Sequence, residues 1–548
     1  MDFTKHFATR LRRLLTPQSE PIPGSAQIAN SAGGYTWPVD PWTRLDRFLI
    51  LGSEGGTFYI GERKLTQENA QAVVECLALD GPRTVRRILE VSLFGRAPKN
   101  DPALFALAIA AGLGDAPTKA AVWTALPQVA RTATHLFHWL QYVKAFRGWG
   151  RGVRRAVAAW YTAKPAKELA YQILKYPSRD GWAHRDALRL AHPVAPTAAH
   201  TQVFRYATKG DTGAGDAEVT ELIDAVRALP HQPPGLAAQA IVRFGLTREM
   251  VPTQLLSHAV IWEALLERMP LTAMIRNLGV MSKVGLLAPM SDAVHTITVR
   301  LGDRAALKAA RVHPIALLAA LKTYAQGHGM KGKNSWRAVP QVVDALDRAF
   351  YLAFDHAPTT GKRVMLALDV SGSMTGRVNG MPYLTCREAS AAMALVTAST
   401  EPVHMFTAFT AGSYASRWSP RLGSGLSTLA ISPRQRLDDV VTRISGLDFG
   451  GTDCALPMLE AVKHRWPIDL FVIYTDNETW AGAVHPVQAL REYRERMGIA
   501  AGLVVVAMAS NGFTIADPAD AGMLDVVGFD SAVPGVIADF GGGRAGGR

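Results

Sequence analysis

An apolar run at residues 364–368 leads directly into the sequence DVSGS, which begins at Asp369, and this junction constrains the fold most strongly. A second apolar run, residues 470–474, leads in the same way into Thr475 and Asp476. Short, fully apolar runs bounded by polar residues are typical of buried strands in a parallel sheet. Because the carboxyl ends of parallel strands share one edge of the sheet, we expect the two carboxylates to lie close together.

The DVSGS segment brings three oxygen-bearing side chains into one loop: Asp369, Ser371 and Ser373. Thr452 and Asp476, from later loops, can complete a set of hard oxygen ligands. Mg²⁺ and Mn²⁺ prefer such ligands and keep positions open for water or for a partner's carboxylate. We therefore predict a divalent cation, Mg²⁺ or Mn²⁺, at these five residues. The alternative is that they form a hydrogen-bonded loop scaffold that binds no metal tightly.

The chain after Gly361 alternates strands with helices. Strands are expected at 364–368, 403–408, 470–474 and 501–506, and helices at 385–398, 436–444, 455–463 and 486–497. Apolar strands between amphipathic helices indicate an α/β domain with a doubly wound, mostly parallel sheet covered on both faces.

Residues 65–350 follow a different pattern, in which short Ala- and Leu-rich amphipathic segments are separated by Pro or Gly. Helices are expected at 67–78, 84–94, 103–111, 119–131, 135–146, 237–242, 254–268 and 314–324. Many short helices joined by short turns favour a helical-repeat solenoid, although the sequence contains no strict repeat. The 548-residue chain is therefore expected to form at least two domains.

The positive charge is concentrated in the predicted helical part. Residues 361–548 contain 16 Lys and Arg against 18 Asp and Glu, whereas the whole chain has a net charge of +13. A concentrated positive field favours polyanionic partners. The alternative is that a general excess of arginine raised the charge with no partner involved.

Two segments interleave cations with aromatic residues, at 144–155 and 175–192. Lys and Arg contact phosphates, and aromatic rings stack on unpaired bases, so the composition suits single-stranded or looped RNA. Lys144 and Arg147 are candidate RNA contacts in the first segment. For Trp149 and Trp182 a role as core anchors is favoured over stacking on bases.

Several other classes of protein are disfavoured. The three cysteines are too few and too widely spaced for a disulfide framework or a zinc site, which favours a reducing, cytoplasmic location. No apolar stretch approaches the ~20 residues that span a bilayer, so no membrane association is expected. The segment 327–334 nearly matches a phosphate-binding loop, but it follows a helical pattern and lacks the Ser or Thr that would bind Mg²⁺. No nucleophile motif is present, and the protein is not expected to be an enzyme.

The motifs resemble two known modules. The DVSGS loop with Thr452 and Asp476 resembles the metal-ion-dependent adhesion site of von Willebrand factor A domains. The segments 30–35, 42–48, 51–59, 276–279 and 327–336, together with the stretch 175–192, resemble a TROVE module. The order of the two modules is similar to that of the Ro autoantigen family, over roughly residues 28–540. It implies a TROVE module at 28–358 and an A domain at 361–540. The segment at 1–27 and the glycine-rich tail at 541–548 are expected to be flexible.

This resemblance implies a closed ring of HEAT-like helical repeats with the A domain as its clasp. The ring would bind small noncoding Y RNA on its basic outer surface and single-stranded ends of misfolded RNA in its central hole, in RNA quality control. Family RNA-contacting positions map onto Lys175, Arg179 and His192, with His184 and Arg185 in the same stretch. Bacterial relatives work with an exoribonuclease, polynucleotide phosphorylase, which is thereby an expected partner.

Two other functions remain open from the residues alone. A cation-dependent protein–protein adaptor would use the A domain, and its basic charge would be incidental. A ribonuclease would need catalytic residues that the sequence does not display.

Overall fold

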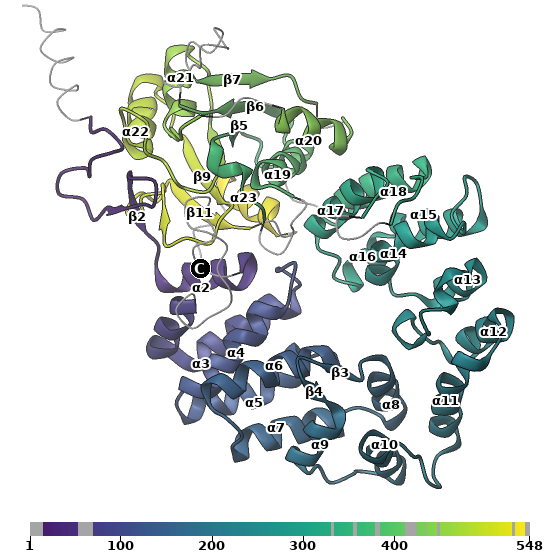
Figure 1. Ribbon diagram of the computed structural model, residues 1–548. Helices are drawn as coiled ribbons and strands as arrows, with labels where there is room; N and C mark the ends of the chain where they lie inside the picture. The colour runs from purple at the N-terminus through teal and green to yellow at the C-terminus, as the bar shows by residue number, and fades with distance from the viewer. Residues whose placement is uncertain are drawn as a thin grey trace, which may run out of the picture. The chain divides into compact units, whose positions relative to one another are not determined.

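The computed structural model describes residues 15–52, 70–329, 334–354, 359–378, 384–411, 425–432, 435–446, 450–528 and 532–542. The chain divides into two compact units, whose elements are labelled in Figure 1. One unit is helical and comprises residues 70–312 and 316–352. The other is an α/β unit that contains the C-terminal third of the chain and also residues 15–52.

The helical unit is a succession of short helices. Their bounds are α3 (Gln71–Leu93), α4 (Asp101–Leu113), α5 (Ala116–Val129), α6 (Ala133–Phe146), α7 (Arg151–Thr162), α8 (Ala166–Lys175), α9 (His184–Ala191), α10 (Ala198–Lys209), α11 (Ala217–Ala228), α12 (Pro234–Phe244), α13 (Ala259–Arg268), α14 (Leu271–Lys283), α15 (Asp292–Gly302), α16 (Arg304–Ala309), α17 (Pro314–Ala325) and α18 (Pro340–Leu352).

Helices of this unit pack on the next helix along the chain and on the next but one. Helix α3 packs on α4 and α5, α4 packs on α6, α5 on α7, and α7 on α9. Their shared faces bury large apolar side chains such as Trp139, Trp160 and Trp262. Packing between sequence neighbours is the pattern of a helical-repeat structure, as the sequence predicted.

Helix α3 joins two segments that the sequence presents as separate helices. Asp80 has non-helical backbone angles at a kink, and Pro82 follows inside the helix. Proline removes one backbone donor and clashes with the preceding turn, so it bends a helix. Apolar residues on both sides of the kink nevertheless stay buried, among them Val73, Cys76 and Ile88.

The α/β unit contains a six-stranded sheet in the order β11-β9-β8-β5-β6-β7. Its strands are β5 (Arg363–Asp369), β6 (Val403–Phe409), β7 (Leu426–Leu429), β8 (Leu470–Thr475), β9 (Gly502–Ala507) and β11 (Met523–Val527). All neighbouring pairs are parallel except β6 with β7. The mostly parallel sheet confirms the predicted fold class. The edge strands β7 and β11 were not predicted, because neither carries a long apolar run.

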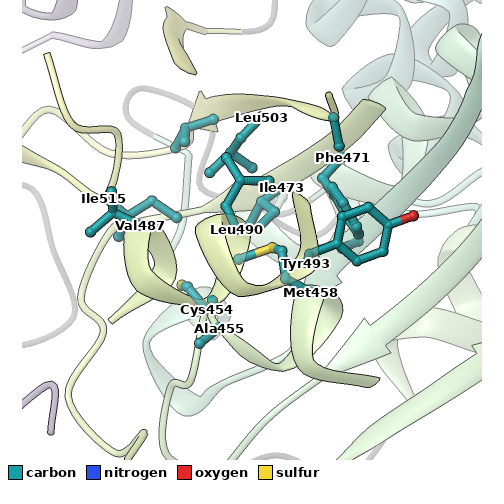
Figure 2. Packing of buried hydrophobic residues seen from close by; sticks show 14 of the residues in the cluster. Cys454, Ala455, Met458, Phe471, Ile473, Val487, Leu490, Tyr493, Leu503 and Ile515 are labelled. Atoms are coloured by element: carbon teal, nitrogen blue, oxygen red, sulfur yellow. The ribbon is translucent and has the colours of Figure 1, made fainter. Parts of the chain in front are cut away.

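Helices cover the sheet on both faces. They are α19 (Cys386–Thr400), α20 (Leu437–Ser445), α21 (Leu456–Lys463), α22 (Pro486–Met497) and α23 (Val533–Gly541). Helix α19 packs on β5, β8 and α20. On the opposite face, α21 and α22 pack against Phe471, Ile473 and Leu503 through residues that include Met458, Leu490 and Tyr493, as Figure 2 shows. This buried core holds the central strands in place, and the carboxyl ends of these strands carry the candidate site described in the next section.

Residues 15–52 also belong to the α/β unit, which corrects the predicted flexible start of the chain for residues 15–27. Strands β1 (Ile28–Ala29) and β2 (Tyr35–Pro38) form a small sheet with β10 (Phe513–Thr514), and α2 (Pro41–Leu51) follows. Gln18 and Asn30 are buried and hydrogen-bonded to residues more than 400 positions away. The predicted boundary at residue 28 therefore does not coincide with a boundary between the compact units. Residues 1–14 lie outside the described residues.

In the part of the chain that the structure describes, no helix is both long enough and apolar enough to cross a bilayer. The loop that resembles a phosphate-binding motif follows helix α17, as expected, but its residues 330–333 lie outside the described ranges. Residues 53–59 of the TROVE-like opening and 543–548 of the predicted tail lie outside them as well.

Candidate functional site

The five predicted cation ligands come together at the carboxyl edge of the central sheet. Strands β5 and β8 are parallel neighbours, with Leu368 opposite Tyr474, so Asp369 and Asp476 both follow at the same edge. The side chains of Asp369, Ser371, Ser373, Thr452 and Asp476 are each at most 3% exposed. The loop after β5 is joined to the Thr452 loop by a hydrogen bond from Gly372 N to Gly450 O of 3.2 Å.

Hydroxyl and carboxylate oxygens converge in this loop cluster. The Oγ atoms of Ser371 and Ser373 lie 3.0 Å apart. Asp369 accepts hydrogen bonds from Ser371 N at 2.8 Å and from Thr475 Oγ1 at 2.6 Å, one on each carboxylate oxygen. Asp369 is thus held in a fixed orientation, and each of its oxygens keeps a further lone pair for a cation or a water molecule.

Two buried oxygens of the cluster lack a hydrogen-bond partner among the described residues: Thr452 Oγ1 and Asp476 Oδ2. A buried polar atom without a partner costs about 1–3 kcal/mol, so such atoms are rare unless an ion or water satisfies them. Within the described residues no group of three or more His, Cys, Asp and Glu side chains could hold a metal. A cation here would therefore depend on the hydroxyl ligands as well, and the oxygen-only set fits Mg²⁺ or Mn²⁺.

The electrostatics of the cluster favour an added positive charge. Burial raises the pKa of Asp369, and burial followed by the negative charge of Asp369 raises the pKa of Asp476 to about 7. Ionisation of two carboxylates in the same buried site has a high free-energy cost unless a positive charge lies nearby. A divalent cation would supply that charge.

Two residues near the cluster were missed by sequence reasoning. Thr475 orients Asp369 through the 2.6 Å hydrogen bond, and the buried Arg387 of α19 donates to Val370 O and lowers the pKa of Asp369 through its charge. Thr475 directly precedes Asp476, which was a usable signal. Arg387 carried none, because only the packing of α19 on β5 brings it to this edge.

The second candidate site lies in the helical unit around a short hairpin of β3 (Ser178–Arg179) and β4 (Trp182–Ala183). Asp180 and Gly181 both have positive φ values, 51° and 78°, as a two-residue hairpin turn requires. Asp180 also forms a hydrogen bond with the ring of His138 of α6. The hairpin is thereby fixed on its helical support.

Most of the predicted RNA-contacting side chains around this hairpin face solvent. The side chains of Arg179 and Arg185 are 60% and 57% exposed. Lys144 and His192 are also exposed, and His192 ends α9 in the left-handed conformation, with φ of 48°. Lys175, at the end of α8, is half-buried, and its Nζ lies 5.2 Å from the centroid of the Tyr176 ring.

His184 is a correction to the sequence-based assignment, because its side chain is only 2% exposed. Its ring nitrogens pair with Tyr161 Oη at 2.8 Å and Tyr176 O at 3.0 Å. Burial lowers the pKa of His184 to about 4. The structure thus gives His184 a role in holding α7, α9 and the end of α8 together, and it presents no ring edge to a nucleic acid.

Arg147 is exposed but already engaged. Its Nη1 donates to Ala111 O at 3.0 Å, and its guanidinium lies 5.6 Å from the centroid of the Trp123 ring. Trp149 and Trp182 stack on each other, with ring centroids 5.7 Å apart and an interplanar angle of 22°. Both residues are half-buried, so the ring pair packs against the hairpin and keeps part of its surface accessible.

The chain matches two family models. A model described as the TROVE domain matches residues 28–220 and 241–323, and one described as the Ro60 vWA domain matches residues 363–541. RNA-binding protein RO60 of Deinococcus radiodurans is 42% identical over 540 residues, covering 98% of this chain and 99% of the relative. The chain belongs to the RO60 family.

Other comparisons agree with this assignment. RNA-binding protein RO60 of Caenorhabditis elegans is 37% identical over 593 residues, covering 94% of this chain and 90% of that RO60 protein. The crystal structure of the Deinococcus radiodurans RO (RSR) protein matches with a TM-score of 0.70 and 42% identity, over 92% of this chain and 100% of the other. The predicted resemblance to the RO60 family is confirmed.

Proposed function

We propose that this RO60-family protein is a non-enzymatic RNA-binding scaffold. The observation that carries the proposal is the β3–β4 hairpin region, where Arg179 and Arg185 are exposed and Trp182 stacks on Trp149. Exposed guanidinium groups contact phosphates, and a partly exposed ring pair offers a surface on which an unpaired base can stack. The names of the relatives, RNA-binding proteins RO60, support the same function.

The RNA proposed for this region is a small structured RNA of the Y class, with Lys175, Arg179, Arg185, His192 and Lys144 as contacts. A second site for single-stranded RNA ends, the closed ring that would contain it, and an exoribonuclease partner follow from the family resemblance and stay predictions. So do the cytoplasmic location and the absence of enzymatic activity. The resulting role is to hold RNA for quality control or decay.

The proposed cofactor is Mg²⁺ or Mn²⁺ held by Asp369, Ser371, Ser373, Thr452 and Asp476. When bound, the cation would offer an open coordination position to a carboxylate of a protein partner. The buried, unpartnered oxygens of Thr452 and Asp476 are the observation that favours this second function, a cation-dependent protein adaptor. The two functions use different units of the chain, so both can operate in one protein.

Charge reversal tests the RNA proposal. Purified full-length protein with Lys175→Glu and Arg179→Glu should bind a fluorescent RNA hairpin with a single-stranded tail at least ~10-fold more weakly than wild type. The dependence of affinity on salt should also become shallower, because fewer phosphate contacts release fewer counterions. Arg496→Glu is a control on α22, where the side chain is 62% exposed. Equal affinities for the double variant and wild type would overturn the proposed RNA-binding region.

EDTA separates the two functions. The scaffold predicts that RNA binding persists after EDTA treatment, since phosphate contacts carry it. The adaptor predicts that a protein partner dissociates in EDTA and in the Asp369→Ala variant.

A further inference from the structure

The N-terminal strap, defined here as residues 15–30, is hydrogen-bonded to the two loops that carry Thr452 and Asp476. Its backbone is fixed by hydrogen bonds from Gln18 N to Gly482 O and from Tyr35 N to Gln18 O, at 2.9 and 2.8 Å. The strap contains neither a long helix nor a long strand of its own. Its position is therefore set by these tertiary contacts.

Gln18 is the centre of that attachment, and its side chain is fully buried. Nε2 donates to Asp453 Oδ1 and to Val484 O, each at 2.7 Å. Oε1 accepts from the hydroxyl of Thr479. One amide thus links the residue next to Thr452 with a residue three positions after Asp476.

The linked groups also connect the two ligand loops to each other. Thr452 O accepts hydrogen bonds from Trp480 N at 3.1 Å and from Ala481 N at 3.0 Å. Cys454 N donates to Thr479 Oγ1 at 3.1 Å. The Gln18 amide therefore ties together both loops, which carry the two oxygens without a partner among the described residues, Thr452 Oγ1 and Asp476 Oδ2.

The packing around the amide leaves no spare room. A Cβ atom added at Gly482 would lie 2.2 Å from Gln18 Nε2 and 2.4 Å from Asp453 Oδ1. A Cβ added at Gly34, in the turn after the strap, would lie 1.9 Å from Thr479 O. Asn30 adds a hydrogen bond from its Nδ2 to the same Thr479 O, at 2.7 Å. The strap thus packs closely against the ligand loops in this arrangement.

We propose that Gln18 is a positioning residue for the cation site, and that docking of the N-terminal strap and cation occupancy stabilise each other. The inference rests on the proposed function of Asp369, Ser371, Ser373, Thr452 and Asp476 as cation ligands. Its physical basis is thermodynamic linkage. If the strap holds the ligand loops in the arrangement that binds the cation, it raises the affinity for the cation. The bound cation must then favour docking of the strap by the same factor.

The first test measures Mg²⁺ affinity by titration calorimetry on EDTA-stripped, dialysed full-length protein. Gln18→Met keeps the side-chain volume and removes all three side-chain hydrogen bonds, so it should lower Mg²⁺ affinity by at least ~5-fold. Gln27→Met is the matched control, because Gln27 also lies in the strap but its side chain pairs with His485, at 3.3 Å, and with Ile22 N and Ser25 Oγ of the strap itself. Gly482→Ala should act like Gln18→Met, since its methyl group would displace the amide.

The second test is hydrogen exchange measured by mass spectrometry, which measures how cation binding changes the protection of the strap amides. Mg²⁺ should slow exchange of the Gln18 and Tyr35 amides in wild type and should leave it unchanged in Asp476→Ala. Slower exchange in the ligand loops alone, with an unaltered strap, would overturn the coupling. So would equal Mg²⁺ affinities for Gln18→Met and Gln27→Met.

These outcomes separate the inference from the cation site on which it rests. If wild type binds no Mg²⁺ or Mn²⁺, the proposed cation site fails, and the coupling fails with it. If wild type binds Mg²⁺ and Gln18→Met binds it equally well, the cation site stands and the positioning role of Gln18 is wrong.

Discussion

Arg47 in α2 donates from Nη2 to both carboxylate oxygens of Asp525 in β11, each at 2.8 Å. Its Nη1 donates to Asn511 O and Phe513 O, both at 2.8 Å. The Arg47 side chain is fully buried, and its ion pair with Asp525 joins the N-terminal part of the chain to the sheet. Residues near the start of the sequence are thus an integral part of the C-terminal unit.

Removal of Arg47 should strongly destabilise the α/β unit. Arg47→Met leaves the Asp525 carboxylate without its cation, and breaking a buried pair in this way costs about 3–5 kcal/mol. The measurement is urea unfolding of the full chain, followed for the transition of the α/β unit. Arg363→Met is the control, because the Arg363–Asp469 pair is more exposed, at 41% and 24%, and should cost less. Equal losses for the two variants would contradict the assigned role of Arg47.

Acid should destabilise the helical unit through two buried histidines. Burial lowers the pKa values of His184 and His135 from 6.5 to about 4. The unfolded chain then takes up protons before the folded chain does, so the stability is complete above pH 6.5 and declines as the pH falls towards 4. Between pH 7.5 and 5.5 each histidine should account for about 1 kcal/mol.

His184→Gln tests this pH dependence. The variant keeps polar groups near Tyr161 and Tyr176 but cannot titrate, so its unfolding free energy should vary less with pH than that of wild type. The measurement compares urea midpoints at pH 7.5 and 5.5. Identical pH slopes would show that His184 does not carry the effect.

Mg²⁺ should stabilise the α/β unit, and more so at pH 8 than at pH 6. The pKa of Asp476 is raised to about 7, so at pH 6 a proton competes with the cation for that carboxylate. In the metal-free protein the raised pKa of this carboxyl means that the folded state becomes less stable as the pH rises towards 7, because the buried carboxyl must then lose its proton. A bound cation would offset that loss of stability. Thermal unfolding with and without MgCl₂ at the two pH values measures the effect.

Asp476→Asn should abolish most of the Mg²⁺-dependent shift, because it removes the ligand charge. Saturation at 100 times Kd corresponds to about 2.7 kcal/mol of stabilisation in wild type. Asp438→Asn is the matched control, since Asp438 is a more exposed carboxylate in α20 that pairs with Arg436. A shift of equal size in both variants would place the cation elsewhere.

Trp182→Leu should weaken binding of RNA that carries unpaired bases and leave the salt dependence unchanged. Base–aromatic stacking contributes about 1–3 kcal/mol per base without neutralising a phosphate. The measurement is fluorescence anisotropy over a range of salt concentrations. Trp336→Leu is the control, because Trp336 stacks on Tyr324 in another part of the helical unit. If Trp182→Leu binds as wild type does, the ring pair serves only to anchor the hairpin.

Much of the candidate cation site could be predicted because its information is local. Asp369 and Asp476 each follow an apolar strand, and the rule that parallel strands align their carboxyl ends brings them to one edge. Arg179 and Arg185 could likewise be predicted as exposed cations, because they lie in a basic segment of the sequence. His184, one residue from Arg185, was misassigned because burial of a ring depends on what packs against it, and here the rings of Phe137 and Tyr161 do so.

The sequence by itself determined the two unit types, the mostly parallel sheet and the chemical set of candidate cation ligands. These follow from the periods of apolar residues and from the polar residues that directly follow the strands. Only the tertiary structure decided where residues 15–30 belong and which residues support the ligand loops. The Gln18 amide meets Asp453 across 435 positions of sequence, through hydrogen bonds that impose no period on the neighbouring residues. Such a contact exists only in the folded sheet, so it cannot be predicted from the residues next to either partner.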